Sequence, residues 1–156
     1  MTIYAGPDLS DGVVALRAPD PADLRQVEPA PDVEPAFRHW LAVAQSGANV
    51  HYFGVYVGNR LAGQIMLHDI DPTAGEALIG YHLFDPEFRG KGYGSRALDL
   101  LLSYVHTLNL LRVFIITSRD NIASQRIAEK SGFSYDGPSR EDPVNGMVFV
   151  LKLAPE

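Results

Sequence analysis

A glycine-rich stretch between an apolar strand pattern and an amphipathic helix pattern constrains the fold more than any other part of the chain. Residues 84–94 read FDPEFRGKGYG, with glycines at positions 90, 92 and 94. Alternate glycines let the backbone turn tightly and expose successive N–H groups. At a helix start these groups join the free donors and the positive end of the helix dipole, which favours an anion. With Arg89 and Lys91 beside them, the stretch predicts a diphosphate-binding loop.

The spacing of the glycines argues against two common phosphate-binding motifs. A nucleoside-triphosphate loop needs Gly-x-x-x-x-Gly-Lys followed by Ser or Thr, and the interval from Gly90 to Gly94 is wrong for it. A dinucleotide fingerprint needs a third glycine where this chain has Ser95. A plain turn that binds no ligand remains an alternative, because glycine also marks turns.

The segments on either side of the loop predict a strand–helix–strand unit. The strand is expected over residues 76–84, and the helix begins near Ser95 with an apolar stripe of Ala97, Leu98, Leu101, Leu102, Val105 and Leu108. A second strand, from Leu111 to Thr117, is apolar enough to be buried on both faces. A helical crossover joins parallel strands, so these two strands should form a parallel pair.

The remaining segments predict antiparallel strands and further helices. In chain order they are an irregular lead-in (1–12), a strand (13–17), a short helix from Asp20, a helix (33–44), a hairpin (50–57 and 60–70) around Gly58-Asn59, a helix capped by Asp120 or Asn121 and ended by Gly132, and two strands (134–136 and 147–153). We therefore expect one α+β domain over residues 1–156. Its sheet should be mixed, twisted and mostly antiparallel, with a central parallel strand pair and helices on both faces.

Composition narrows the functions open to the chain. It has no cysteine, so no disulfide, thiolate metal site or cysteine nucleophile is available. A net charge of -6 argues against nucleic acid and favours cationic partners such as amines. No apolar run is long enough for a membrane span, and the N-terminus has no signal pattern. We expect a cytoplasmic monomer or homodimer that binds neither membrane nor nucleic acid.

The order of the motifs resembles a known family. Arg89-x-x-Gly92-x-Gly94, placed between a strand and a helix, resembles the acyl-coenzyme A binding motif of the GNAT-type N-acetyltransferases. Asn121-x-x-Ser124, leading to Ser131-Gly132-Phe133, resembles that family's next helix, and the likeness runs over residues 13–153. Ile79-Gly80-Tyr81 is closest to the branch that acetylates ribosomal-protein N-termini. The resemblance implies the GNAT-like acyl-coenzyme A acyltransferase fold.

It also implies an activity and a binding site. Acetyl-coenzyme A is the expected co-substrate, no metal is expected, and the acceptor is a primary amine of a protein N-terminus or a small molecule. The acceptor amine would attack the thioester directly in a ternary complex. The expected cofactor contacts are Leu83, Phe84, Arg89, Gly90, Lys91, Gly92, Tyr93, Gly94, Ser95 and Asn121. Backbone N–H groups near Leu83 and Phe84 would point at the thioester oxygen.

The resemblance specifies the catalytic residues less completely than the cofactor contacts. Ser124 aligns with the serine that the branch uses to protonate the leaving thiolate, while Ala128 replaces the tyrosine used by many other members. Ser124 could instead only cap its helix. In that case Tyr81, Tyr135 or solvent would supply the proton.

The general base that would deprotonate the amine is the catalytic group that the resemblance specifies least, because Leu78 occupies the position where many members carry glutamate. His82 lies on the same strand face and has an ordinary pKa near 6.5. Glu76 shares that face, and water could also serve. With Leu78 and Ala128 in these positions, a non-catalytic acyl-coenzyme A-binding or regulatory domain is the alternative function.

The resemblance places the acceptor side of the cleft in the region before residue 50. Phe37, His39 and Trp40 are candidate specificity residues there. Phe37 and Trp40 could equally be ordinary core residues.

Overall fold

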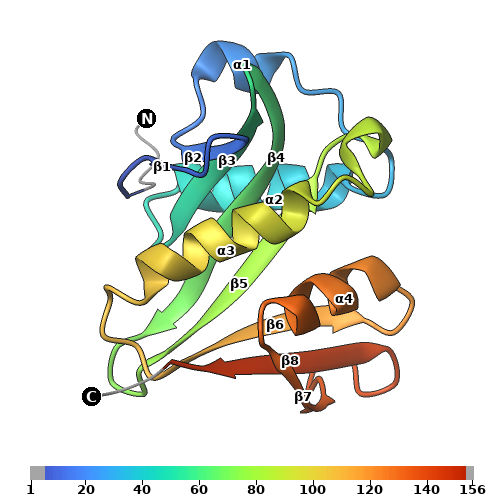
Figure 1. Ribbon diagram of the computed structural model, residues 1–156. Helices are drawn as coiled ribbons and strands as arrows, with labels where there is room; N and C mark the ends of the chain where they lie inside the picture. The colour runs from blue at the N-terminus through green and yellow to red at the C-terminus, as the bar shows by residue number, and fades with distance from the viewer. Residues whose placement is uncertain (1–5, 154–156) are drawn as a thin grey trace.

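The computed structural model describes residues 6–153, which form one eight-stranded sheet in the order β1-β2-β3-β4-β5-β6-β8-β7 (Figure 1). The strands are β1 Leu9–Ser10, β2 Val14–Arg17, β3 His51–Val57, β4 Arg60–Asp71, β5 Glu76–Leu83, β6 Arg112–Ser118, β7 Ser134–Pro138 and β8 Gly146–Lys152. The helices are α1 Pro21–Arg25, α2 Glu34–Gln45, α3 Tyr93–Val105 and α4 Ile122–Lys130, with a 3-10 turn at Pro86–Phe88. The mixed, mostly antiparallel sheet is the predicted fold class. No helix within residues 6–153 is long and apolar enough to cross a membrane.

The predicted parallel pair is present, but it is short. β5 and β6 pair only from Glu76↔Arg112 to Leu78↔Phe114, while β6 pairs with β8 along its whole length. Beyond Leu78 the two strands diverge, as Figure 1 shows. The sheet therefore opens between the last part of β5 and the last part of β6.

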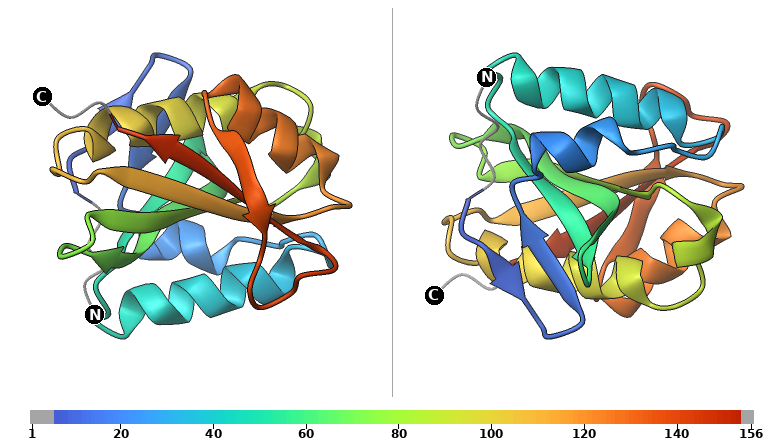
Figure 2. Two further views of the ribbon diagram at one scale, coloured as in Figure 1. Left: turned by 90° about the horizontal axis from the view of Figure 1, so that it is seen from below. Right: turned by 90° about the horizontal axis from the view of Figure 1, so that it is seen from above.

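Helices cover both faces of the sheet, as predicted. Figure 2 shows α3 and α4 on one face and α1 and α2 on the other. Five of the six predicted α3 stripe residues are buried, namely Ala97, Leu98, Leu101, Leu102 and Val105. The sixth, Leu108, lies beyond the end of the helix and packs against the core from there.

Both ends of α4 follow the prediction. Asn121 is the N-cap, and its side chain accepts a hydrogen bond from the Ser124 N–H at 3.0 Å. At the other end Gly132 adopts φ 97 and Phe133 N–H donates to Ala128 O at 3.0 Å, the long bond of a Schellman motif. Phe133 is buried against the core. Both ends of α4 are therefore set by residues next to them in the chain.

Two predictions about elements were wrong, and a third element begins two residues earlier than the position given for it. β6 is not buried on both faces: Ile116 is 48% exposed, because α1 and α2 pack over β3 and β4 and leave that face of β6 open. Helix α3 begins at Tyr93, and the preceding loop contains a 3-10 turn capped by Asp85. The expected lead-in carries strand β1, and residues 1–5 lie outside the described part of the chain.

Candidate active site at the opening of the sheet

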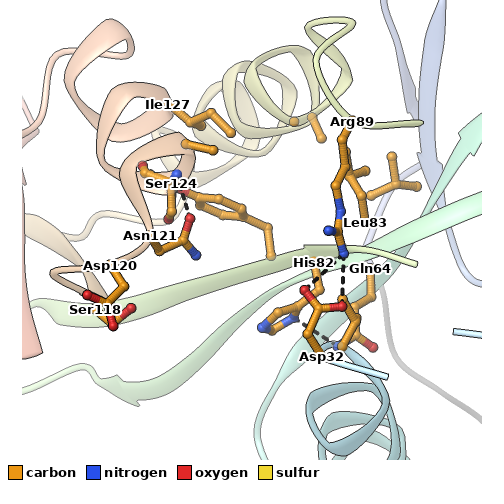
Figure 3. A pocket seen from close by; sticks show the side chains of 16 residues that line it. Asp32, Gln64, His82, Leu83, Arg89, Ser118, Asp120, Asn121, Ser124 and Ile127 are labelled. Carbon is orange, nitrogen blue, oxygen red and sulfur yellow. Dashed lines mark hydrogen bonds and ion pairs between the residues drawn. The ribbon is translucent and has the colours of Figure 1, made fainter. Parts of the chain in front are cut away.

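A cavity of about 470 Å³ lies where β5 and β6 diverge (Figure 3). We call it the central cavity. It is lined by Asp32, Val33, Val55, Gln64, Tyr81, His82, Leu83, Arg89, Gly94, Ala97, Ser118, Asp120, Asn121, Ala123, Ser124 and Ile127. These residues come from both faces of the sheet, so the central cavity spans the sheet from the α3–α4 side to the α2 side.

The glycine-rich loop forms one rim of the central cavity. Gly90 and Gly92 adopt φ 73 and φ 82, left-handed values that glycine accepts without strain. Gly92 is the N-cap of α3, so the N–H groups of the first turn, from Tyr93 to Ser95, have no acceptor within the helix. An added Cβ at Gly90 or Gly92 would meet nothing within 4 Å. The backbone there is open to a ligand, as a phosphate cradle requires.

Gly94 has a different role. A Cβ at this position would lie 3.0 Å from Ile127 Cδ1. The absence of a side chain therefore lets α3 approach α4 closely beside the central cavity.

The two basic residues of the loop lie apart from each other. Arg89, which we predicted on the diphosphate, reaches across the central cavity to Asp32, with Nη2 3.2 Å from each carboxylate oxygen (Figure 3). Lys91 lines a second hollow together with Gly92, Ser95, Arg96 and Lys130. Arg96 forms an ion pair with Asp11, which also lines this hollow, so positive charge near the start of α3 comes from Lys91 and Lys130. Arg89 links the two sides of the central cavity.

Ser124 and Tyr81 form a pair of hydroxyl groups on the α4 side. Their oxygens are 3.0 Å apart, and Tyr81 Oη also lies 3.2 Å from the Ser124 carbonyl oxygen, to which it donates. The helix cap is supplied by Asn121, so the alternative that Ser124 only caps α4 is wrong. Burial raises the pKa of Tyr81, which keeps its phenol protonated.

Tyr81 is one of the three sources of the proton that the sequence allows in place of Ser124. Tyr135 was another, but it is 48% exposed on β7, packs against Phe149 and does not line the central cavity. Ala128, in the position where many relatives carry tyrosine, is fully buried. Within residues 6–153, the hydroxyl groups that line the central cavity belong to Tyr81, Ser118 and Ser124, of which Tyr81 and Ser124 form the pair.

His82 lies on the opposite face of the sheet and is partly buried. Its Nδ1 is 3.1 Å from Gln64 Nε2. Burial, aided by the nearby His68, lowers the pKa of His82 to about 4. A base at neutral pH would need a pKa near the ordinary histidine value of about 6.5, and His82 does not have one. Glu76, the other candidate, forms an ion pair with Arg112 at the far end of β5.

The two backbone donors predicted at the end of β5 differ. Phe84 N–H donates to Ala62 O at 2.8 Å, so it already has a partner within the fold. N–H groups alternate between the two edges of a strand, so the N–H of Leu83 is directed away from β4, toward the opening. Leu83 alone keeps the predicted orientation.

Comparison with known proteins decides the family. Residues 7–134 match the acetyltransferase (GNAT) domain. The chain belongs to this family. The Bacillus subtilis protein named "Putative ribosomal N-acetyltransferase YdaF" is 36% identical over 96 residues, which are 60% of this chain and 52% of that relative. This chain therefore matches about half the length of YdaF.

Two further comparisons extend over more of the chain. The spermidine N(1)-acetyltransferase of Escherichia coli is 27% identical over 139 residues, 80% of this chain and 74% of the relative. The structure of RimL, a ribosomal L7/L12 alpha-N-protein acetyltransferase in complex with coenzyme A, gives a TM-score of 0.73 at 20% identity, over 94% of this chain and 98% of that one. The latter similarity shows a shared fold.

The predicted specificity residues of this GNAT domain lie outside the central cavity. Phe37 is fully buried against Phe84, with ring centroids 4.7 Å apart, and so belongs to the core. Trp40 packs on His68 at 4.2 Å, and the exposed His39 packs on Trp40 at 4.8 Å. Trp40 and His39 line a separate hollow between α2 and the last part of β4.

Sequence reasoning missed four polar residues of the central cavity as site residues. They are Asp32, Gln64, Ser118 and Asp120. The sequence pattern predicts a role for Asp120 only as a possible helix cap. Asp32 follows a proline-punctuated connection, and Gln64 is the only amide side chain in β4. No spacing rule connects these positions, because only the folded sheet brings them together. Within residues 6–153, no cluster of three or more His, Asp or Glu side chains could hold a metal ion.

Proposed function

We propose that this GNAT domain transfers an acetyl group from acetyl-coenzyme A to a primary amine. The central cavity is the observation that carries the proposal. It spans the sheet, with an open backbone cradle and a helix N-terminus on one side and the Asp32 carboxylate on the other. A thioester co-substrate can enter from the α3–α4 side while a cationic acceptor enters from the α2 side.

The residues at the cradle suit the diphosphate of coenzyme A. The open backbone at Gly90 and Gly92 and the free N–H groups at the start of α3 provide donors without a steric obstacle. Lys91 and Lys130 add positive charge beside them. Together these groups would hold an anion by short hydrogen bonds and by charge.

Acetyl transfer requires three things: stabilisation of the charge on the carbonyl oxygen, a proton for the leaving sulfur, and a route by which the amine loses its proton. The amine nitrogen attacks the carbonyl carbon and forms a C–N bond, and the negative charge that develops on the carbonyl oxygen would be stabilised by the N–H of Leu83. When the C–S bond breaks, the sulfur takes a proton from the Ser124 hydroxyl group. The Ser124 oxygen can regain a proton when the Tyr81 phenol turns its one hydrogen from the Ser124 carbonyl oxygen to the hydroxyl oxygen, and Tyr81 then takes a proton from solvent. The proton lost by the amine passes to solvent. His82 is too weak a base for this last step.

Asp32 lies on the α2 side and Asp120 lies beside Asn121 at the start of α4, and both carboxylates of the central cavity would favour a cationic acceptor (Figure 3). A protein N-terminus and a polyamine both satisfy that charge requirement, and the relatives include enzymes named for each. Charge alone therefore does not select the acceptor class, which depends on the hydrogen-bonding groups in the wall of the central cavity.

Thiol release in the presence of acetyl-coenzyme A and a panel of amines tests the proposal. Release that depends on both the amine and the intact chain supports it. Calorimetric binding of coenzyme A with no release for peptides, polyamines or small amines would instead establish the alternative, a non-catalytic acyl-coenzyme A-binding domain. No heat with coenzyme A at millimolar concentration would refute both.

A further inference from the structure

Gln64 is the fully buried polar side chain at the centre of a chain of hydrogen bonds on the α2 side of the central cavity. Tyr52 Oη donates to Gln64 Oε1 at 2.6 Å. Gln64 Nε2 donates to the backbone oxygen of Ala36, in α2, at 3.3 Å, and lies 3.1 Å from His82 Nδ1. Both Gln64 and Tyr52 are at most 1% exposed. A side chain tied to three elements cannot turn to suit a ligand.

This chain of bonds determines which nitrogen of His82 carries the hydrogen. A backbone carbonyl can only accept, so Ala36 requires the amide of Gln64 to present its nitrogen on this side. The second hydrogen of that nitrogen then points at His82 Nδ1, which must accept it. A neutral imidazole has one accepting and one donating nitrogen. The hydrogen of His82 therefore lies on Nε2, and Figure 3 shows that edge of the ring turned away from Gln64.

We propose that Gln64 is a positioning residue that holds His82 in the Nε2–H tautomer, so that His82 offers the acceptor substrate a hydrogen-bond donor and does not take its proton. The role in catalysis rests on the acetyltransferase function proposed above. The tautomer does not, because it follows from the hydrogen bonds alone.

The proposal selects among acceptor classes. A donor in the wall of the central cavity needs an accepting atom on the substrate, and leaving it unpaired in the complex costs affinity. A peptide N-terminus carries a carbonyl group directly attached to its amine-bearing carbon, whereas a protonated polyamine presents only N–H donors. His82 therefore favours an acceptor with a carbonyl oxygen close to its amine.

Nitrogen-15 NMR of the histidine rings tests the tautomer without any activity assay. Protonated and unprotonated ring nitrogens give separate signals, and His82→Phe identifies the His82 pair among the five histidines of the chain. We expect hydrogen on Nε2 and none on Nδ1 at neutral pH. Hydrogen on Nδ1, or rapid exchange between the two nitrogens, would overturn the proposal.

Gln64→Met tests the positioning role, because it keeps the length of the side chain and removes the N–H donor. The His82 signals should then show both tautomers, and kcat/KM for an alanyl peptide should fall about 5- to 10-fold, the effect of one lost hydrogen bond. His82→Phe should reduce kcat/KM for the peptide by a similar factor and reduce kcat/KM for a simple alkylamine by a smaller one. Unchanged tautomer and kinetics in Gln64→Met would refute the role of Gln64, and equal losses for both amines in His82→Phe would refute donation to the acceptor.

Gln64→Glu gives a signature that lost packing alone would not produce. A carboxylate accepts hydrogen bonds and would favour hydrogen on His82 Nδ1, so the pKa of His82 should rise from about 4 into the assay range. The other ionisable groups around the ring or the central cavity are His68, Tyr52, Tyr81, Asp32, Asp120 and Arg89. A new inflection in the pH dependence of kcat/KM, lost in the double variant with His82→Phe, would support the proposal. Its persistence in the double variant would contradict it.

Gln45→Glu adds the same charge at an exposed position and serves as the control. Thermal unfolding shows whether each variant folds. If Gln64→Glu does not fold, the Gln64→Met and NMR results decide the matter.

Discussion

The two sides of the central cavity differ in how the chain encodes them. On the α3–α4 side, the loop glycines, the first turn of α3, Asn121 and Ser124 all lie between residues 90 and 124, and most act through backbone geometry and helix ends. On the α2 side, Asp32, Gln64 and His82 come from a loop and two strands and act through side-chain contacts. The side proposed for the co-substrate follows local rules and can be recognised in sequence, whereas the side proposed for the acceptor depends on tertiary contacts and cannot.

The largest effect should come from the hydroxyl pair on the α3–α4 side. Ser124→Ala should lower kcat by roughly 10- to 10000-fold and leave the affinity for acetyl-coenzyme A nearly unchanged, as expected for loss of a general acid. Tyr81→Phe should lower kcat in the same range, because the two oxygens are 3.0 Å apart and share one hydrogen bond. Turnover and binding must be measured separately on an accepted amine.

The double variant decides whether the two hydroxyl groups act together. If they form one proton path, Ser124→Ala with Tyr81→Phe should lose no more activity than the worse single variant. Multiplied losses would mean independent roles. A kcat within about twofold of wild type in Ser124→Ala would exclude Ser124 as the acid and assign the proton to Tyr81 or solvent.

The next largest effect should come from the cradle. Gly92→Val adds a side chain where the backbone must approach phosphate, and it should weaken coenzyme A binding by an order of magnitude or more. The substitution also strains a residue at φ 82. Gly47 provides a matched control, since it adopts φ 84 with nothing within 4 Å of an added Cβ and lies just beyond α2.

Gly47→Val should therefore lower the melting temperature about as much as Gly92→Val, because the backbone strain of ~1–2 kcal/mol is the same. Only Gly92→Val should lose coenzyme A affinity. Equal and unchanged affinity in both variants would reduce the glycine-rich stretch to a plain turn.

Local sequence predicts much of the fold and less of the site. The sheet, the parallel pair, the α3 stripe and both ends of α4 follow from periodicity, turns and caps, which depend on neighbouring residues only. The exposure of Ile116 did not follow, because it depends on which strands α1 and α2 cover. The pKa of His82 and the partner of Arg89 also did not follow, since burial, Gln64 and Asp32 come from distant parts of the chain.

Asn121 combines a local and a ligand role on the α3–α4 side, with a smaller expected effect. Asn121→Ala removes the bond to Ser124 N–H and should cost about 1 kcal/mol of unfolding free energy while also weakening coenzyme A binding. Asn121→Asp retains the accepting oxygen and removes the amide donor. Chemical denaturation should find Asn121→Asp nearly as stable as wild type, with calorimetry showing weaker binding. Normal affinity in both variants would leave Asn121 as a helix cap only.

The smallest effect tests the contact between the two sides. Arg89 and Asp32 are both exposed to solvent, and such pairs contribute about 0.2–1 kcal/mol. A diphosphate on the loop competes with Asp32 for Arg89, so Asp32→Asn should release Arg89 and tighten coenzyme A binding by about 1.4- to 5-fold at low salt. Glu34→Gln removes the same charge two residues further on but frees only Arg38, and it should change affinity less.

If both variants tighten binding equally, the effect is one of general charge. If Asp32→Asn alone tightens it, and the gain disappears in Asp32→Asn with Arg89→Ala, the ion pair opposes co-substrate binding and couples the two sides of the central cavity.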